Sequence, residues 1–340
     1  MYKIHLLLFI VSLLISCSSK KNEPKVYNQT GRALGTTFTI LYVAPKQVGT
    51  METSLDSIFQ VINKSMSTYI STSDISKINS GDTSVKVDAM FAEVFTLSKK
   101  IHQVSKGYFD PTVGELVNAW GFGPKMGVKQ MQPQVVDSLM QFVGFDKVKL
   151  KSDYTIQKSH PNIYLDFNAI AKGYCLDRIA AYLDSEYIGN YLIELGGELV
   201  AKGTKIIAAQ EQVSWTVGID DPNQTTERTL ITTLKLKDKA MATSGNYRKF
   251  RVDTLTGKKY VHTIDPFTGY TKPSAILSAS VIASNCALAD GYATAFMAMP
   301  LKETKAVLKT QPLDAYIIYS DASGSLKTYI TNGFQSLLNE

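Results

Sequence analysis

The sequence predicts an α+β protein, in which long helices and antiparallel strands occupy different parts of the chain. Helical periodicity dominates residues 51–107, whereas short apolar runs separated by turns dominate from residue 190 onward. Segregation of this kind favours a sheet with helices gathered beside it over a wound βαβ arrangement. The chain has 340 residues, of which 44% are hydrophobic and 19% charged, so it can build a large core and is typical of a globular enzyme.

The N-terminus resembles an export signal. One Lys precedes an apolar run over residues 4–15, which is too short to cross a bilayer comfortably. The following Leu14-Ile15-Ser16-Cys17 resembles a bacterial lipobox, in which Cys17 becomes the lipidated first residue. We expect a lipoprotein signal peptide over 1–16, lipidated Cys17 with a polar tether to 27, and a folded domain over 28–335. The protein would then face the periplasm from the inner or outer membrane, and a plain signal peptide or uncleaved anchor is the alternative.

The first part of the folded domain is predicted to be scaffold. Alternating apolar positions from Val26 to Val43 indicate a strand after a Gly turn. Apolar residues at helical spacing predict a helix over Met51–Met66 with one buried face. Asp88 is the expected N-cap of a second helix that stops at Gly107.

The middle of the chain is less regular. The segment from Gly107 to Pro124 is rich in Gly, Pro and aromatic residues, which is typical of a loop that walls a pocket. An amphipathic helix is expected over about 132–143. Residues 164–166 are predicted to end a strand that leads into another helix, with Asn168 as its N-cap.

The second half is predicted to be rich in strands. Two apolar runs, one on each side of Gly196-Gly197, indicate a hairpin. Further short strands are expected in SWTVGIDDP, TLITTLKLKD, AMATSG, YRKFRV, YVHTIDPFTG, 276–282, LDAYIIYS and KTYIT, with helices in NCALADGYATAFMAM and over 301–308.

Cysteine content and charge limit the function classes. Cys175 and Cys286 lie in apolar helical contexts, where a free buried thiol is more common than a disulfide. The net charge of +6 is too small and too scattered for a nucleic-acid footprint. The sequence also contains no Cys/His metal cluster, no phosphate-binding Walker loop and no G-x-S-x-G motif.

Asp290 and Thr294 are the first candidate pair. They are four residues apart in a predicted helix and therefore project from one face, while their neighbours are apolar. An Asp in such a helix is costly to bury unless it is paired or binds a metal. Asp and Thr oxygens suit Mg²⁺, which takes few protein ligands. A structural alternative is that the Asp compensates the helix dipole and the Thr hydroxyl bonds a carbonyl of its own helix.

A second candidate lies in LDFNAIAKGY, where Asp166 and Lys172 flank a predicted helix start. Helix N–H groups and a Lys suit a phosphate, whereas the Asp should repel one. A Mg²⁺ ion shared between a carbonyl near Ala169 and Asp290 would reconcile the two charges. The structural alternative makes Asp166 a capping acid and Lys172 a solvated side chain.

His262 in HTIDPFTGY precedes a Pro/Gly turn, where a His can act as a general base near neutral pH. A surface histidine of a strand is the alternative. In AMATSG, Thr243, Ser244 and Gly245 are either a phosphate-contacting turn or a bulge.

Taken together, these segments resemble the ApbE family of FAD:protein FMN transferases. The resemblance runs from about Arg32 to Ile330 through eight blocks in the order of the family: ALGTTF, MSTYISTSDISKIN, FDPTVGELVNAWGFGP, LDFNAIAKGY, YLIELGGELVAKG, ATSGNYR, HTIDPFTG and ALADGYATA. It implies an ApbE-like, T-fold-like unit of two closely packed lobes, with a mostly antiparallel or mixed sheet and flanking helices.

The resemblance also implies an activity. Family members transfer the FMN part of FAD to a Thr or Ser of a target flavoprotein through a phosphoester bond, release AMP and need Mg²⁺. Exported members serve membrane redox complexes. Two rival functions stay open: a Mg²⁺-dependent FAD pyrophosphatase that forms FMN and AMP, and a flavin-binding lipoprotein without turnover.

The resemblance assigns roles to residues of this chain. The metal ligands would be the carbonyl of Ala169 and the side chains of Asp290 and Thr294, and His262 would activate the target hydroxyl. Two departures from the family, Leu34 for Met and Asn168 for Gly, are expected to be tolerated. The residues that the resemblance places against FAD are Leu34, Tyr69, Tyr108, Phe109, Asp110, Asp166, Lys172 and Ile264.

Overall fold

A computed structural model describes most of the chain after its first 22 residues. The described ranges are 23–127, 131–207, 211–222, 229–246, 250–252, 259–271 and 274–339. The predicted signal peptide and Cys17 lie outside these ranges and stay predictions. In the part of the chain that the structure describes, no helix combines the length and the apolar content that a membrane crossing requires.

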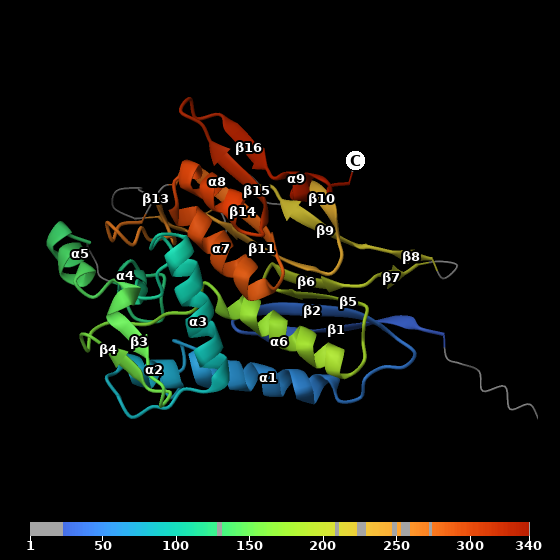
Figure 1. The fold of residues 1–340 in the computed structure, drawn as a ribbon, viewed down its shortest axis with the longest axis horizontal. Helices are drawn as coiled ribbons and strands as arrows, with labels where there is room; N and C mark the ends of the chain where they lie inside the picture. Colours follow the sequence, from blue (N-terminus) through green and yellow to red (C-terminus); the bar gives the residue numbers. More distant parts are fainter. Residues whose placement is uncertain are drawn as a thin grey trace, which may run out of the picture.

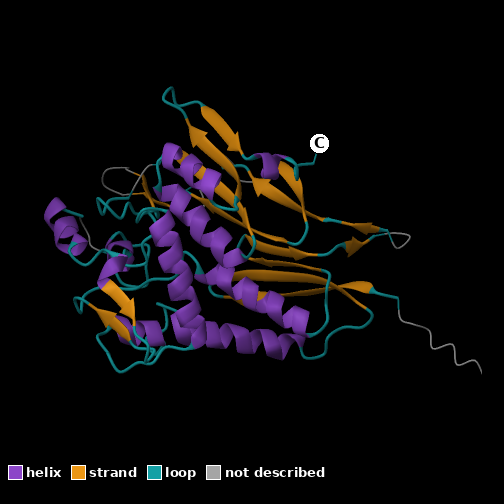
Figure 2. Ribbon diagram, viewed as in Figure 1, coloured by secondary structure: helices purple, strands orange, loops and turns teal. Residues whose placement is uncertain are grey.

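A large antiparallel sheet organises the described residues, with the longer helices gathered on one side of it (Figures 1 and 2). Eight described strands form this sheet in the order β1-β2-β5-β6-β11-β14-β15-β16, and every neighbouring pair is antiparallel. Their bounds are β1 Lys25–Ala33, β2 Thr36–Ala44, β5 Tyr191–Leu195, β6 Glu198–Lys202, β11 Lys239–Gly245, β14 Ile276–Ala283, β15 Asp314–Ser320 and β16 Leu326–Ile330.

The smaller described sheets are two-stranded and antiparallel. They pair β3 Val148–Leu150 with β4 Ile156–Lys158, β7 Lys205–Ile206 with β8 Gln212–Val213, β9 Trp215–Asp220 with β10 Leu230–Leu236, and β12 Phe250–Val252 with β13 Lys259–Val261. The described helices are α1 Met51–Met66, α2 Asp74–Asn79, α3 Ala89–Val104, α4 Gly114–Ala119, α5 Pro133–Met140, α6 Ala171–Ser185, α7 Cys286–Ala298, α8 Leu301–Thr310 and α9 Asn332–Gln335, with a 3-10 turn at Phe145–Lys147.

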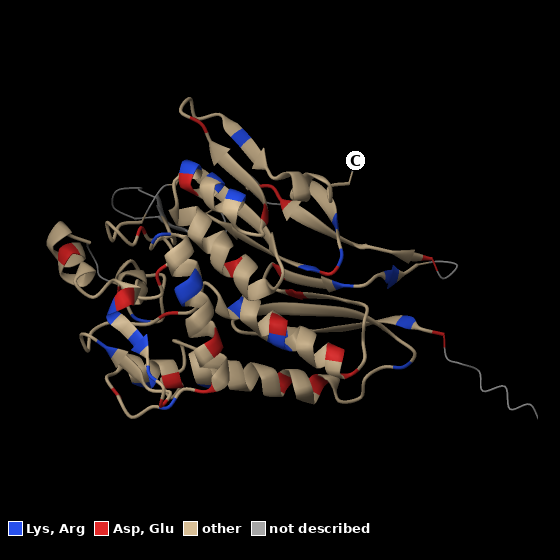
Figure 3. Cartoon of the chain, viewed as in Figure 1, with Lys and Arg blue, Asp and Glu red and all other residues tan. Residues whose placement is uncertain are grey.

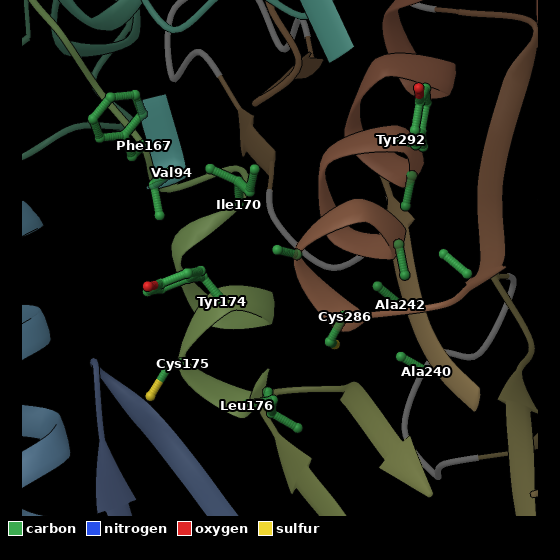
Figure 4. Packing of buried hydrophobic residues seen from close by; sticks show 14 of the residues in the cluster. Val94, Phe167, Ile170, Tyr174, Cys175, Leu176, Ala240, Ala242, Cys286 and Tyr292 are labelled. Atoms are coloured by element: carbon green, nitrogen blue, oxygen red, sulfur yellow. The ribbon is translucent and has the colours of Figure 1, made fainter. Parts of the chain in front are cut away.

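Both faces of the large sheet are buried, as the alternation along β11 shows. Ala240 and Ala242 point into the main core with α6 and α7; Cys286 at the start of α7 lies near them, and Tyr292 lies further along the same helix (Figure 4). Met241 points to the opposite face, into a smaller core with β9, β10 and α9. Side chains on alternate faces follow from the period of two in a strand. The buried, free thiols of Cys175 and Cys286 belong to the main core, as predicted.

Most predicted elements are confirmed. The bounds of α1 agree with the prediction, and the carboxylate of Asp88 caps α3 by accepting from the Phe91 N–H at 2.8 Å. The predicted α+β class and antiparallel sheet are also confirmed.

Four details of the fold differ from the predictions. Residues 164–166 do not end a strand, because Tyr164 forms only an isolated parallel bridge with Val113. The segment from Val26 to Val43 forms two strands joined at Leu34 and Gly35, whose positive φ values of 47° and 77° suit a two-residue hairpin turn. β1 begins at Lys25, within the predicted tether, because Val26 and Tyr27 pair with β2. The irregular segment 107–124 contains the short helix α4.

Candidate active site

A cavity of about 860 Å³ lies where α1, α6, α7, β6, β11 and the segment 107–124 meet. This volume is in the range of small-molecule and cofactor sites. All the residues predicted to form the site line this one cavity: Leu34, Tyr69, Tyr108, Phe109, Asp110, Asp166, Ala169, Lys172, His262, Ile264, Asp290 and Thr294. The structure therefore brings together residues that are up to 260 positions apart in sequence.

The start of α6 differs from its prediction. Asn168 does not cap the helix, because Ile170 occupies the N-cap position and offers no side-chain hydrogen bond. The chain turns before the helix instead, and the carboxylate of Asp166 accepts from the Asn168 N–H at 2.7 Å. Asp166 thus stabilises the turn that carries Ala169 into the cavity.

One N-terminal N–H group of α6 and two of α7 are satisfied by a side chain of the other helix. Asp290 of α7 accepts from the Gly173 N–H of α6 at 3.0 Å. Asp177 of α6 accepts from the N–H groups of Cys286 and Ala287, at 2.7 and 2.9 Å, at the start of α7. Such groups have no partner within their own helix. The two carboxylates therefore fix the contact of the helices next to the cavity.

A glycine permits this close contact. A Cβ atom at Gly173 would lie 2.3 Å from the carbonyl oxygen of Cys286 and 2.8 Å from the Cβ of Asp290. The LDFNAIAKGY block therefore contains Gly173 because only a glycine fits against α7.

Two buried carboxylates and one partly exposed ammonium group form a charged cluster at the cavity. Asp290 is 4% exposed and Glu198, the first residue of β6, is 3% exposed. The ammonium group of Lys172 forms an ion pair with Oε1 of Glu198. Lys172 is therefore not the solvated side chain of the structural alternative.

The cluster shifts the pKa values of its members. Burial raises the pKa of Asp290 to about 7, and the negative charge of Glu198 adds to this effect. Burial lowers the pKa of Lys172, but the carboxylates of Glu198 and Asp290 outweigh it, so the pKa lies above its ordinary value. Lys172 is therefore charged at neutral pH, whereas the charge of Asp290 responds to its surroundings.

Glu198 was not predicted from the sequence. It directly follows the Gly196-Gly197 turn, and both glycines have positive φ values, of 64° and 107°. This turn returns the chain as β6, and Glu198 lies at its start, facing the cavity. The only local signal was an acidic residue at the first position of the strand, directly before the apolar Leu199, Val200 and Ala201.

A hydroxyl group of α7 lies close to a hydroxyl group of β11, one turn along α7 from Asp290. Thr294 lies one turn after Asp290, and its hydroxyl is 3.3 Å from that of Ser244. Thr243 is 2.8 Å from the hydroxyl of Ser280 in β14. Thr243 and Ser244 belong to a regular strand, so this segment is neither a turn nor a bulge.

Asp110 organises the loop that forms one wall. Its carboxylate accepts from the N–H and hydroxyl of Thr112, at 2.8 and 2.6 Å, and from the Phe145 N–H at 3.1 Å. Phe109 is buried beside it, and Tyr108 packs edge-on against Phe267 with 4.8 Å between ring centroids. The contribution of Asp110 to the cavity is therefore mainly the shape of this wall.

The remaining predicted residues line the mouth and the far wall. Tyr69 is 59% exposed, and burial together with the charge of Asp166 raises its pKa. Ile264 is buried, and the ring of His262 lies 6.4 Å from that of Phe122. His262 therefore faces the cavity as part of an aromatic wall, unlike a surface histidine of a strand.

The predicted metal ligands offer oxygen donors that suit Mg²⁺. Among the described residues, no three His, Cys, Asp or Glu side chains cluster as a metal site. A site with one carboxylate, one hydroxyl and one backbone carbonyl fits an ion that completes its octahedron with water and phosphate. Asp290, Thr294 and Ala169 line the same cavity, so the donor set is compatible with this ion.

Comparison with known proteins decides the family. The model of the ApbE family matches residues 34–317. The chain belongs to the ApbE family. ApbE relatives named FAD:protein FMN transferase include one from Haemophilus influenzae, 32% identical over 96% of both chains, and one from Vibrio cholerae, 31% identical over 98% of this chain and 99% of the relative.

Solved ApbE structures share the fold. The flavin transferase ApbE from Vibrio cholerae has a TM-score of 0.81 and 30% identity, covering 93% of this chain and all of that one. The apo flavinyl transferase ApbE from Pseudomonas stutzeri has a TM-score of 0.80 and 27% identity, covering 93% and 97%. The predicted family and fold are therefore confirmed, while the roles of individual residues stay predictions.

Charged residues are interspersed elsewhere on the ApbE fold. Figure 3 shows Lys, Arg, Asp and Glu distributed over many helices and strands. At the cavity, the carboxylates of Glu198 and Asp290 are buried.

Proposed function

We propose that this chain transfers FMN from FAD to a hydroxyl group of a target flavoprotein and releases AMP. The observation that carries this proposal is the single cavity in which all the residues assigned through the family resemblance meet. Relatives with the name FAD:protein FMN transferase align over nearly the whole chain and support the same activity.

The cavity residues suggest how the substrate is held. The partly exposed ring of Tyr108 on the cavity wall offers an aromatic surface for a flavin or purine ring, while the neighbouring Phe109 is buried. The ammonium group of Lys172 provides positive charge for the diphosphate. Asp166 faces the same space and can accept hydrogen bonds from the ribose or the ring. These contacts position the diphosphate near Asp290 and Thr294.

We propose that the three oxygen donors of Asp290, Thr294 and Ala169 hold Mg²⁺. A bound Mg²⁺ ion would neutralise charge that builds up on the diphosphate during transfer. Lys172, held by its ion pair with the buried Glu198, would add a fixed positive charge.

His262 is the proposed base for the acceptor. Its place on the cavity wall allows it to take the proton of a Thr or Ser hydroxyl as that oxygen attacks the phosphorus of the FMN half. The bond between the two phosphates breaks, and AMP leaves with its phosphate. Catalysis would then be mainly positioning and electrostatics, with a base contribution of roughly 10²–10⁴-fold.

We also propose that Cys17 carries a lipid anchor, so that the domain works at the periplasmic surface of a membrane. The lipobox-like Leu14-Ile15-Ser16-Cys17 supports this proposal. The target would then be an exported flavoprotein, with membrane redox complexes as the first class to test.

The activity is tested by following AMP and FMN with and without an acceptor. The purified chain is incubated with FAD and Mg²⁺, first alone and then with exported proteins from a strain that lacks its gene. AMP release that is slow alone and rises on addition of acceptor supports the transferase. Steady release of AMP and free FMN without acceptor would instead establish a pyrophosphatase, and FAD binding without AMP formation would establish a binding protein.

A further inference from the structure

Glu198 has a carboxylate oxygen that the protein does not use. Its Oε1 pairs with Lys172, whereas its Oε2 is buried and accepts no hydrogen bond. Among the described side chains, this is the one carboxylate oxygen in that condition. An unsatisfied buried polar atom is costly, so natural proteins keep one where a ligand, an ion or a water satisfies it.

The surroundings of this oxygen indicate which ligand it serves. Glu198 lines the cavity together with Asp290 and Thr294, and α7 packs against β6. Asp290 accepts from the N–H of Gly173, the residue after Lys172, and Glu198 pairs with Lys172, so both carboxylates lie at the start of α6. Two carboxylates and one ammonium group carry a net charge of −1 when all are ionised. This charge favours binding of a cation over binding of an anion.

A bound divalent cation would outweigh this net negative charge, whereas the Lys172 ammonium group alone does not. The cation would change the net charge of the cluster from −1 to +1, and the diphosphate of FAD would then be attracted. Carboxylate oxygens are the usual ligands of Mg²⁺ and Mn²⁺, directly or through a bound water.

We infer that Glu198 belongs to the cation site, with Oε2 directed at the ion or at a water bound to it and Oε1 holding Lys172 toward the phosphates. This inference rests on the cation site of the proposed function and adds a residue to it. Glu198 would link the ion to Lys172, so that the two positive charges act on the diphosphate from fixed positions.

The test measures cation binding without substrate. Mn²⁺ is titrated into the FAD-free chain by calorimetry, and free Mn²⁺ is followed by electron paramagnetic resonance. Glu198→Gln should weaken Mn²⁺ binding about 10–100-fold, the usual effect of losing a residue that supports a metal site. Glu198→Asp keeps the charge but withdraws the oxygen, and it should also weaken binding by about tenfold. The control is Glu303→Gln, which removes a surface carboxylate paired with Lys106 at 2.8 Å and should bind as wild type.

The variant Lys172→Met tests whether Glu198 acts on the ion or only holds Lys172. If Glu198 acts on the ion, Glu198→Gln weakens Mn²⁺ binding in this background as well. Loss of the effect there, or Mn²⁺ binding by Glu198→Gln within twofold of wild type, would overturn the inference. If Glu198→Gln does not fold, Glu198→Asp alone decides, and unchanged Mn²⁺ binding by that variant would also overturn it.

The outcome is separable from the proposed activity. A wild-type chain that binds Mn²⁺ and releases AMP with acceptor, beside a Glu198→Gln variant that binds Mn²⁺ equally, refutes only the role of Glu198. A wild-type chain that binds no Mn²⁺ refutes the cation site itself, and the inference with it.

Discussion

Replacing Gly173 by Ala should separate α6 from α7 at the cavity. The new Cβ would lie 2.3 Å from the carbonyl oxygen of Cys286, about 1 Å less than an ordinary contact. That oxygen belongs to the backbone and cannot rotate away. Overpacking of this kind costs about 1–3 kcal/mol, against a gain of about 1 kcal/mol from the better helix propensity of Ala.

Because the contacted atom is a backbone oxygen, the cost lies at the upper end of this range, and we expect Gly173→Ala to lower the free energy of unfolding by about 2 kcal/mol. At 2–4 °C per kcal/mol this corresponds to a fall in Tm of roughly 4–8 °C. Because Asp290 accepts from the Gly173 N–H, the displacement should also weaken Mn²⁺ binding and slow AMP release.

Calorimetry and the Mn²⁺ titration check both parts of this prediction. The control is Gly189→Ala, because a Cβ at Gly189 meets no atom within 4 Å and its φ is not positive. A Gly173→Ala chain with the Tm and Mn²⁺ affinity of wild type would refute the tight contact of α6 with α7.

Four further predictions follow from the site. Burial raises the pKa of Asp177 from 3.8 to about 6, so between these values the folded protein keeps a proton that the unfolded chain has lost. The free energy of unfolding should therefore fall by up to roughly 3 kcal/mol as the pH rises from about 4 to about 6, and Asp177→Asn should flatten this slope in urea titrations at several pH values; an unchanged slope would contradict the shift. Lys172→Met should raise the KM for FAD at least about tenfold, because one charge-assisted contact contributes about 1.5–3 kcal/mol, and an unchanged KM would remove Lys172 from the phosphate site. His262→Gln should slow acceptor-dependent AMP release by about 10²–10⁴-fold with little change in FAD binding measured by fluorescence, and a full transfer rate would exclude it as the base. Tyr69→Ala should weaken FAD binding by about 1 kcal/mol without changing Tm, because its ring is mostly exposed at the mouth; equal FAD affinity would place the ring outside the site.

The elements that the sequence predicted well are those whose signals are local. Leu55, Phe59, Ile62 and Met66 recur at helical spacing, and all four are buried on one face of α1. The cap of α3 was also predicted, because Asp88 directly precedes the helix and accepts a hydrogen bond from the N–H of Phe91 in its first turn.

Predictions from the sequence were wrong where a helix start is stabilised by a residue that is distant along the chain. The start of α6 was misassigned because its Gly173 N–H is satisfied by Asp290, 117 residues further along the chain. The nearer Asn168 satisfied the local rule and still does not cap the helix. No local pattern contains such a contact.

Glu198 was missed for the same reason. Its partner Lys172 is 26 residues away in another element, and only the order of strands places them together. The other site residues were predicted because the family resemblance, and no local pattern, assigns them to one site.

We propose that this chain attaches FMN covalently to a hydroxyl group of another protein. Mass spectrometry decides this by comparing exported proteins from cells with the gene, without it, and with the Asp290→Ala variant. We predict a Thr or Ser carrying the mass of FMN only in cells with the unaltered gene. The same modified residue in cells without the gene, or in cells with Asp290→Ala at the wild-type level, would contradict the proposed transfer and its cation site.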